Sequence, residues 1–392
     1  MSAVAGRPFS LARPGFDASH DLFRQTVRAF VERDIVPRHE EWCRAGMVDK
    51  ELFARAGAAG LLGIDVPESH GGGGVPDFRY NAIITEEGAR AHVASSVAGL
   101  HLHIDVCVPY FLDAATDAQR DRWLPGICAG TLVTALAMTE PSCGSDVAAM
   151  TTTATRDGDH YVINGAKTFI SNSQNFDLLL LACKTDPTQR HRGISIIVVE
   201  ADRPGLERGR RLAKAGQHSA DTGELFFTDV RVPVANRLGA EGGGFAQLMT
   251  KLPRERLSIA VGAVAQAEAA LDLTLGYVGE RHAFGRPIGS FQNSRFRLAE
   301  MRTEIDIARV FVDRQIEALN AGELTPEAAA EAKWWTTEMC HRVVDGCVQL
   351  HGGYGYMDEY PVSRAWRDTR VMRILGGTTE IMKEVIGRGM GL

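Results

Sequence analysis

The chain reads QLHGGYGY at residues 349–356 and LGGTTE at residues 375–380, two glycine-rich turns within strongly patterned helical sequence. Glycine lets the backbone turn where side-chain bulk is absent, so another backbone or a ligand can come close. In the second turn Thr378 or Thr379 can cap the following helix, and the free N–H groups of a capped helix suit a diphosphate. Either turn alone is typical of an ordinary helix C-cap. Together, with arginines between them, they indicate a binding site.

Length and composition exclude several classes of protein. The chain has 392 residues and a net charge of -6, with a pI near 6.1, so no basic face for nucleic acid is expected. This length suits two or three domains. Seven cysteines without a C-x-x-C pair indicate free thiols in a reducing compartment. Residues 1–15 lack a charged start followed by an apolar run, and no later segment holds about 18 consecutive apolar residues, so we expect a soluble, cytoplasmic protein.

The N-terminal third has helical periodicity. Apolar residues at helical spacing predict helices over residues 21–35, 50–59, 80–111 and 118–130. The last of these is expected to end at Pro125 and Gly126. His101 and His103 form an H-x-H pair within the third helix. Such a pair could ligate a metal, but we favour core or interface histidines.

From residue 131 the pattern changes to period-two and β-branched runs, which are typical of strands. The predicted strands are Leu132–Met138, Tyr161–Ile163, Leu178–Leu181, Ile194–Val199 and Leu225–Val232. Turn signals separate them, among them Asp157-Gly158-Asp159 and Asn164-Gly165, at the spacing of an antiparallel sandwich or barrel. No crossover helices fit between the strands, so a doubly wound nucleotide fold is not expected.

After residue 242 the helical pattern returns, over residues 245–280, 292–321 and 325–350. Thr325-Pro326-Glu327 is a clear helix start, with a cap, a proline at the first position and an acid in the first turn. We expect four long antiparallel helices that form a bundle. The predicted class is α+β, with an N-terminal helical domain, a middle antiparallel β domain and a C-terminal four-helix bundle. The predicted boundaries are 1–130, 131–241 and 242–392.

The stretch AMTEPSCGSD at residues 137–146 leaves a strand and enters a loop rich in backbone donors and small hydroxyls. Such a loop can hold the edge of a flat polar ring, although a simple capped turn has the same composition. Taken with residues 349–368 and the order α, β, α, this loop resembles the acyl-CoA dehydrogenase family. The resemblance covers residues 21–387 and is closest to the long-chain branch.

The resemblance implies tightly bound FAD, an acyl-CoA substrate, a homotetramer and an electron-transferring flavoprotein as acceptor. By matching positions, the flavin ring meets Met138, Thr139, Phe169, Ile170 and Ser171, where many relatives carry Trp in place of Phe169. Ser145 matches a contact to the CoA part of the substrate. Thr378 and Glu380 match positions on FAD. The positions that match contacts to the FAD of a neighbouring subunit are Arg281, Phe284, Gln292, Gln349, Leu350, His351, Gly352 and Gly353.

One position departs from the commonest family pattern. In many members the residue at Gly376 is the glutamate that removes the α-proton, and glycine has no group for this task. Long-chain and isovaleryl-type enzymes instead place the glutamate on the first bundle helix, where this chain has Glu255. The missing side chain at Gly376 leaves room for Glu255 to reach the substrate. Glu255 could also be an exposed first-turn acid near a helix dipole, but we favour catalysis.

The implied reaction is dehydrogenation of a saturated acyl-CoA to a trans-2-enoyl-CoA. Glu255, with a pKa raised by burial, takes the α-proton while the β-carbon passes hydride to flavin N5. The resemblance assigns the enolate oxygen to the N–H of Gly377 and a ribityl hydroxyl, and Arg256 is expected to help hold the substrate. Fatty-acid β-oxidation or branched-acyl catabolism is the expected pathway.

Three alternatives stay open at the level of sequence. Acyl-CoA oxidases share this architecture, but no oxidase-sized extra C-terminal domain is present. A non-catalytic acyl-CoA or flavin-binding homologue would keep the fold without a base, and Glu255 argues against it. The acyl group could also be amino-acid-derived or a sterol side chain. The pattern leaves chain length, branching and the electron acceptor open, and does not separate tetramer from dimer.

Overall fold

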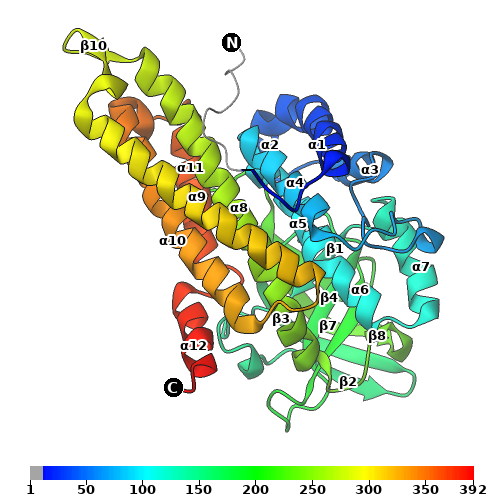
Figure 1. Cartoon of the computed structure of the whole chain (residues 1–392). Coiled ribbons are helices and arrows are strands. Elements are labelled where there is room, and N and C mark those ends of the chain that lie inside the picture. The colour runs from blue at the N-terminus through cyan, green and yellow to red at the C-terminus, as the bar shows by residue number, and fades with distance from the viewer. Residues whose placement is uncertain (1–11) are drawn as a thin grey trace.

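The computed structural model describes residues 12–392 and begins with a helical N-terminal part, blue to cyan in Figure 1. Its helices are α1 (Ala18–Phe30), α2 (His39–Ala45), α3 (Glu51–Ala58), α4 (Phe78–Arg90), α5 (Ala94–His101), α6 (Val108–Ala114) and α7 (Asp117–Cys128). Asp17 caps α1, where its side chain accepts the N–H groups of Ser19 and His20. Thr116 and Gln119 form a capping box at the start of α7.

Two helix predictions in this part were wrong in detail. The predicted helix 80–111 is divided, because α4 ends at Arg90 and the chain turns through His92, which has a φ of 58°. Helix α7 continues through Pro125 and Gly126 instead of ending there. The buried residues Ile127 and Cys128 lie beyond this proline, so apolar packing outweighs the hydrogen bond that proline removes.

The middle of the chain forms an eight-stranded sheet in the order β6-β7-β3-β2-β4-β5-β8, with β1 paired to β4. The strands are β1 (Thr134–Ala137), β2 (Thr153–Asp157), β3 (His160–Ser171), β4 (Leu178–Lys184), β5 (Ile194–Glu200), β6 (Leu206–Arg211), β7 (Thr222–Pro233) and β8 (Arg237–Leu238). Most pairs are antiparallel, as predicted, while β1 and β2 run parallel to β4. Both faces of β4 are buried, because alternate residues enter two different core clusters.

Strand β3 is longer than predicted because Asn164-Gly165 is a bulge inside the strand and not a turn. Gly165 has a φ of +149°, and a Cβ added there would lie 2.5 Å from the Thr152 hydroxyl. The Asn164 side chain accepts the backbone N–H of Asp229 on the neighbouring strand β7 at 2.9 Å. Glycine thus permits close approach between strands, and pairing continues past the bulge.

The C-terminal part is helical, green to red in Figure 1. Its elements are α8 (Gly244–Glu280), the hairpin of β9 (His282–Ala283) and β10 (Arg286–Pro287), α9 (Gln292–Asn320), α10 (Pro326–His351), α11 (Pro361–Arg370) and α12 (Thr379–Gly389). Thr325 caps α10 as predicted, and its hydroxyl accepts the N–H of Ala328 at 3.1 Å. The bundle has three long helices instead of four, because the glycine turns at Gly352 and Gly376 separate the short helices α11 and α12.

Helix α8 is the core of the bundle. Within residues 12–392 it alone is long and apolar enough to span a membrane, yet 61% of its apolar window is buried inside the molecule. Its alanine-rich face packs in one cluster with α9 and α10 and with Phe78 and Ala82 of α4. The sequence of helical, β and helical parts agrees with the predicted α+β class, and α8 joins the first and last parts.

Candidate active site

Glu255 lies well inside α8, which begins at Gly244, so it is no first-turn acid. Its side chain is buried, and the Tyr110 hydroxyl of α6 donates to its carboxylate at 3.4 Å. Burial raises the pKa of Glu255 to about 7, although Tyr110, Arg256 and Lys251 act in the opposite direction. The carboxyl group therefore titrates near neutral pH, as a general base requires.

The helix turn around Glu255 is anchored to the N-terminal helical part. The Arg254 guanidinium forms an ion pair with Asp65 at 2.9 Å. The Ser258 hydroxyl donates to Asp105, which also accepts the Asn81 amide at 2.7 Å. These contacts flank Glu255 in sequence, so the backbone that carries it is held on both sides.

The glycine turn lies beside the same part of α8. Gly376 and Gly377 have φ values of +67° and +102°, which favour glycine. Arg256 Nε donates to the Gly376 carbonyl at 3.4 Å. A Cβ added at Gly376 would lie 2.4 Å from the Ile259 side chain, one helical turn beyond Glu255. The structure thus brings Arg256 together with Gly376 and Gly377, and Glu255 lies next to Arg256 in the same turn of α8.

The residues predicted to face the flavin ring form a second group, at the ends of β1 and β3. The Thr168 N–H donates to the Thr139 carbonyl at 3.0 Å, and Lys167 Nζ donates to the Met138 carbonyl at 3.0 Å. Phe169 has a φ of +58° and 67% of its side chain is exposed. A bulky residue in this strained conformation is typical of a ligand contact. Ile170 is buried next to it.

A buried ion pair holds this group in place and was not predicted. Lys167 Nζ donates to the Glu140 carboxylate at 2.9 Å, with both side chains buried. Glu140 also accepts the N–H groups of Thr151 and Thr152 at 2.6 and 2.9 Å. Burial alone would raise the pKa of Glu140, but Lys167 and these hydrogen bonds outweigh it and lower the pKa to about 2. Lys167 lies beyond the predicted strand Tyr161–Ile163, so the strand pattern carried no signal for this ion pair.

Ser145 and the start of α12 lie where a ligand can reach them. Ser145 is exposed on the loop after β1, and no hydrogen bond to its side chain forms within residues 12–392. Thr378 caps α12, where its hydroxyl accepts the Ile381 N–H at 3.3 Å, and Glu380 is exposed in the first turn. This is the helix start expected to suit a diphosphate.

Two of the arginines between the two glycine turns form ion pairs within the chain. Arg364 forms an ion pair with Glu40 at 2.6 Å, and Arg367 with Asp358 at 2.8 Å. These two side chains are occupied by the chain's own carboxylates. That these arginines contribute to a site stays a prediction, although both already pair with carboxylates of the same chain.

The remaining predicted cofactor residues gather at the far end of the bundle, around the β9–β10 hairpin (Figure 1). The Tyr277 and His351 rings stack with centroids 4.2 Å apart, and Arg281 lies over the Tyr354 ring. Phe284 is 95% exposed with a φ of +52°. Exposed residues here also include Gln292, Gln349, Gly352 and Gly353, whereas Leu350 is half-buried and His351 is buried. The Nδ1 atom of His351 donates to the Cys347 carbonyl, so this nitrogen already has a partner within the chain.

The turn of α8 that carries Glu255 and the C-terminal end of α8 next to the hairpin are too far apart to form one compact site. Arg256 and Arg281 are separated by about 25 residues of helix, or about 37 Å at the rise of an α-helix. The hairpin group and the Glu255 group are therefore distinct surfaces of a single chain.

The residues around Thr139 and Phe169, the start of α12 and the residues around the β9–β10 hairpin offer donors and open space that fit FAD. The exposed Phe169 ring and the backbone of Thr139 offer a flat apolar face with polar edges. The α12 start offers N–H donors for phosphate. Around Gly352 and Gly353 there is open space at each position where a Cβ would stand, and Arg281 forms no ion pair among the described residues. A flat ring and an anionic diphosphate are what such groups bind.

The histidine pair belongs to the core, as favoured from the sequence. His103 is buried, and its two ring nitrogens bond the Ile127 carbonyl at 3.0 Å and the Thr134 hydroxyl at 2.8 Å. Burial lowers the pKa of His103 to about 4. His101 bonds the Thr85 hydroxyl at 3.3 Å. Within residues 12–392 no group of three or more His, Cys, Asp or Glu side chains could hold a metal ion.

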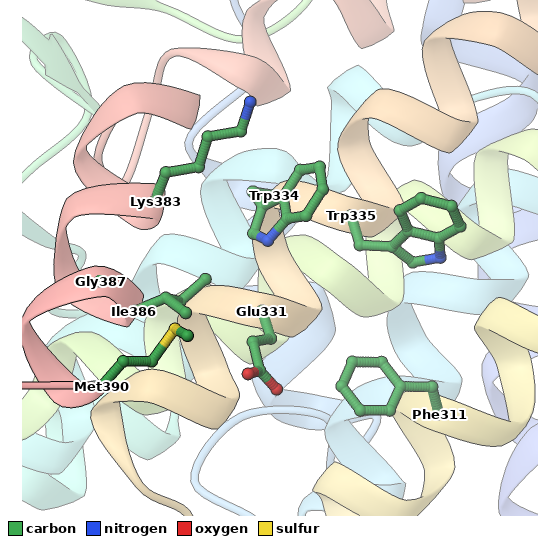
Figure 2. A pocket seen from close by; sticks show the side chains of 8 residues that line it. All are labelled: Phe311, Glu331, Trp334, Trp335, Lys383, Ile386, Gly387 and Met390. Atoms are coloured by element: carbon green, nitrogen blue, oxygen red, sulfur yellow. The ribbon is translucent and has the colours of Figure 1, made fainter. Parts of the chain in front are cut away.

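An apolar pocket of about 440 Å³ opens elsewhere, between α9, α10 and α12 (Figure 2). Its lining includes the Trp334 and Trp335 rings, which meet edge to face, and Lys383 Nζ lies over Trp334. The other lining residues are Phe311, Glu331, Ile386, Gly387 and Met390. None of these was predicted as a site residue, and the pocket has no nucleophile or buried base. It is an apolar surface rather than a catalytic centre.

Three domain families match the chain in order. They are described as the acyl-CoA dehydrogenase N-terminal, middle and C-terminal domains, over residues 17–131, 135–230 and 242–391. The mitochondrial long-chain specific acyl-CoA dehydrogenase of Sus scrofa is 42% identical over 95% of this chain and 86% of its own length. The acyl-CoA dehydrogenase structure from Geobacillus kaustophilus is 46% identical, with a TM-score of 0.95 over 97% of this chain and 100% of that chain. A glutaryl-CoA dehydrogenase from Mycobacterium smegmatis in complex with FADH2 is 25% identical, with a TM-score of 0.89 over 96% and 95%.

Proposed function

Because the chain belongs to the acyl-CoA dehydrogenase family, we propose that Glu255 is the base that removes the α-proton of its acyl-CoA substrate. Family membership makes the chain an FAD-dependent oxidoreductase that acts on CH–CH bonds of acyl-CoA, as its sequence predicted. One observation carries the proposal for Glu255. It is a buried carboxyl group with a pKa near 7, on a helix turn that packs against the glycine turn.

The chemistry requires three things of the chain's residues. The α C–H beside a thioester is a very weak acid, so a carboxylate of raised pKa must lie against it. The developing enolate oxygen needs preorganised donors, and the N–H groups of the glycine turn supply them in this proposal. Water must be excluded, which the buried position of Glu255 favours. When bound, FAD supplies the acceptor for the β-hydrogen, so that a trans-2-enoyl-CoA is formed.

The other predicted residues keep their roles as proposals. We infer that Met138, Thr139 and the stretch 169–171 line the flavin ring, and that Ser145 contacts the CoA part of the substrate. Thr378 and Glu380 would hold FAD at the start of α12. Arg256 is assigned to the substrate site through its bond to the Gly376 carbonyl. The domain boundaries near residues 131 and 242 also remain proposals, which limited proteolysis would test.

Family membership leaves open which acyl-CoA is the substrate and which protein accepts the electrons. We propose a fatty acyl-CoA or a branched acyl-CoA as substrate, in a catabolic pathway such as β-oxidation in the cytoplasm. The long-chain similarity supports the first of these. An electron-transferring flavoprotein is the proposed acceptor. Two rates would be measured on the same sample, the reduction of a purified electron-transferring flavoprotein and the consumption of oxygen. A dehydrogenase should give the first and an oxidase the second.

We also propose a homotetramer. Two exposed apolar surfaces support it, the Phe284 hairpin and the pocket with Trp334 and Trp335 (Figure 2). Because the hairpin group lies about 37 Å along α8 from Glu255, it is suited to complete the cofactor site of another copy. Analytical ultracentrifugation of the FAD-loaded protein tests the oligomeric state, and a stable monomer would contradict the proposal.

The decisive experiment is anaerobic titration of the FAD-loaded protein with saturated acyl-CoAs of graded length and branching. Flavin bleaching with one class would establish the half-reaction and identify the substrate. Tight binding without bleaching would instead support the non-catalytic alternative. Glu255→Gln should keep FAD and acyl-CoA binding yet lose bleaching by at least about 10³-fold, and retention of most activity would refute its role.

A further inference from the structure

The glycine turn is held by a second basic side chain that no prediction included. Lys333 projects from α10 with its side chain fully buried, and its Nζ donates to the Gly377 carbonyl at 2.5 Å. Arg256 from α8 donates to the preceding carbonyl, that of Gly376. Two successive carbonyls of the turn are thus each held by a cation from a different helix.

The N–H groups of the same turn are left without partners. Within residues 12–392, neither the Gly376 N–H nor the Gly377 N–H has a hydrogen-bond acceptor. The described chain has no cis peptide bond, so the carbonyl of Gly376 and the N–H of Gly377 point in opposite directions. Since the carbonyl faces Arg256, the Gly377 N–H points away from that guanidinium. Free amides in a partly buried turn beside a buried base are suited to accept a ligand oxygen.

The turn cannot fix this orientation by itself. Two adjacent glycines at positive φ have wide conformational freedom, and neither has a side chain that could pack. Donors stabilise developing charge only when they are oriented in advance. We propose that Lys333 is a positioning residue: it fixes the peptide that follows Gly377, while Arg256 fixes the peptide that precedes it, so that the free amides of the turn between them meet the substrate's thioester oxygen. This inference rests on the proposed function and deepens it.

The electrostatic surroundings agree with this role. Burial and the nearby Arg256 lower the pKa of Lys333 to about 8, while Glu338 on α10 and Glu380 on α12 act in the opposite direction. Glu338 is itself paired with Arg373 at 2.8 Å. Lys333 is therefore largely protonated at pH 7, where its ammonium group is a strong donor to a carbonyl.

Three variants test the proposal. Lys333→Met removes Nζ but keeps an unbranched chain, and Lys333→Gln keeps a shorter neutral donor. Lys214→Met is the matched control, because Lys214 Nζ also donates to a backbone carbonyl, that of Ala220 at 2.6 Å, outside the glycine turn. FAD content and Tm of each purified protein report on folding. The rate of flavin reduction by a saturated acyl-CoA is then measured anaerobically.

A second readout does not depend on turnover. A 3-thia-acyl-CoA has sulfur in place of the β-carbon, so it has no β C–H to lose, and its bound enolate can be followed by absorbance as the pH is raised. Loss of an oriented oxyanion donor should weaken the enolate more than the neutral ligand. For Lys333→Met we expect flavin reduction to slow by about 10–100-fold. The neutral analogue should bind within about threefold of wild type, while its ionisation moves to higher pH.

The outcomes separate this inference from the proposed function. Lys333→Gln should recover part of the lost rate, and Lys214→Met should match wild type. If Lys333→Met does not bind FAD, Lys333→Gln is compared with wild type instead. Its flavin reduction should be slower by about 3–10-fold. The role of Lys333 would be overturned if the Lys333 variants reduce their flavin and ionise the analogue as wild type does. It would also be overturned if Lys214→Met loses as much activity as Lys333→Met. Either result would leave the proposed function standing. Absence of bleaching in wild type with every acyl-CoA would overturn the proposed function and this inference with it.

Discussion

At the scale of single residues, burial of Glu255 affects stability as well as catalysis. Its folded-state pKa, near 7, lies above the ordinary value of 4.5, so the folded protein retains this proton between those two pH values while the unfolded chain does not. Stability therefore falls as pH rises from about 4.5 to 7, and the penalty is complete above pH 7. A catalytic carboxyl group in this position is maintained at a cost to the fold.

We predict that Glu255→Gln is more stable than wild type at pH 8 and equally stable at pH 5. The gain at pH 8 is on the order of 3 kcal/mol, because the substitution removes the buried charge. Thermal melts of both FAD-loaded proteins at the two pH values provide the measurement. A Tm difference that is the same at pH 5 and pH 8 would argue against a raised pKa.

The glycine at position 376 has a different structural meaning from the one its sequence suggested. The pattern indicated that an absent side chain leaves room for Glu255. The structure adds that Ile259 fills the space next to Gly376, within 2.4 Å of a Cβ built there. Because a helix places residues four apart on one face, Ile259 and Glu255 adjoin on α8. The family resemblance could pair Glu255 with Gly376, but the sequence could not identify Ile259, since an isoleucine in an apolar helix carries no distinguishing signal.

Gly376→Glu in the Glu255→Gln background should accordingly restore little activity. The added side chain clashes with Ile259, and the positive φ costs about 1–2 kcal/mol for a residue with a Cβ. Adding Ile259→Ala should raise the rate of flavin reduction at least about tenfold above the double variant, because it removes the clash. Glu255→Gln with Ile259→Ala is the control and should remain inactive. Equal rates for the double and triple variants would exclude the steric explanation.

At the scale of elements, the strands that the sequence missed are those without an apolar pattern. Strand β6 reads LERGRR and is mostly exposed at the sheet edge, where β7 is its only partner among residues 12–392. Its partner determines that it is a strand, and nothing in its own residues does. The predicted strands β4 and β5, in contrast, are apolar and buried over most of their length. Periodicity therefore identified the apolar strands, but it missed the polar edge strands β6 and β8 and also β2, which lies inside the sheet between β3 and β4.

The buried ion pair between Lys167 and Glu140 joins β3 to the loop after β1, next to the residues predicted to face the flavin. Lys167→Met should destabilise the protein by about 3–5 kcal/mol, because it leaves Glu140 buried without a cation. FAD affinity should fall as well, since Lys167 also holds the Met138 carbonyl. Urea unfolding and FAD titration measure these two effects.

The double variant Lys167→Met with Glu140→Gln provides the control. Removing both charges should recover much of the stability that the single variant loses. If FAD affinity recovers equally, the pair acts through stability alone. If FAD affinity remains low while stability recovers, the Met138 carbonyl needs the lysine itself.

At the scale of the whole molecule, long-range ion pairs hold the parts of the chain together. Glu86 of α4 accepts Arg13 and Arg309 at 2.8 Å and Arg24 at 2.6 Å. Burial would raise the pKa of Glu86, but these arginines outweigh it and lower the pKa to about 2. The cluster ties the N-terminal segment to α9 of the bundle. Its members lie up to 296 positions apart in sequence, from Arg13 to Arg309, so no local pattern could reveal it.

The separation of the predicted cofactor residues into two groups leads to a test with mixed oligomers. If Arg281 serves the site of a neighbouring copy, a Glu255→Gln chain and an Arg281→Glu chain should complement each other. In a mixed pair, the chain with Arg281→Glu keeps Glu255 and receives Arg281 from its partner. One site of that pair is then complete. Oligomers isolated through two different affinity tags should reduce their flavin with acyl-CoA, although each parent alone is inactive.

The reverse combination makes the test decisive. A wild-type chain paired with a chain that carries both substitutions has Glu255 in one site but lacks the partner's arginine there. Its other site has the arginine but lacks the base. If the sites are shared, this pair is inactive even though it contains one unaltered chain. If each chain uses its own Arg281, the same pair keeps one active site and the first combination has none. The two arrangements thus predict opposite results, and flavin content and bleaching of the tagged oligomers distinguish them.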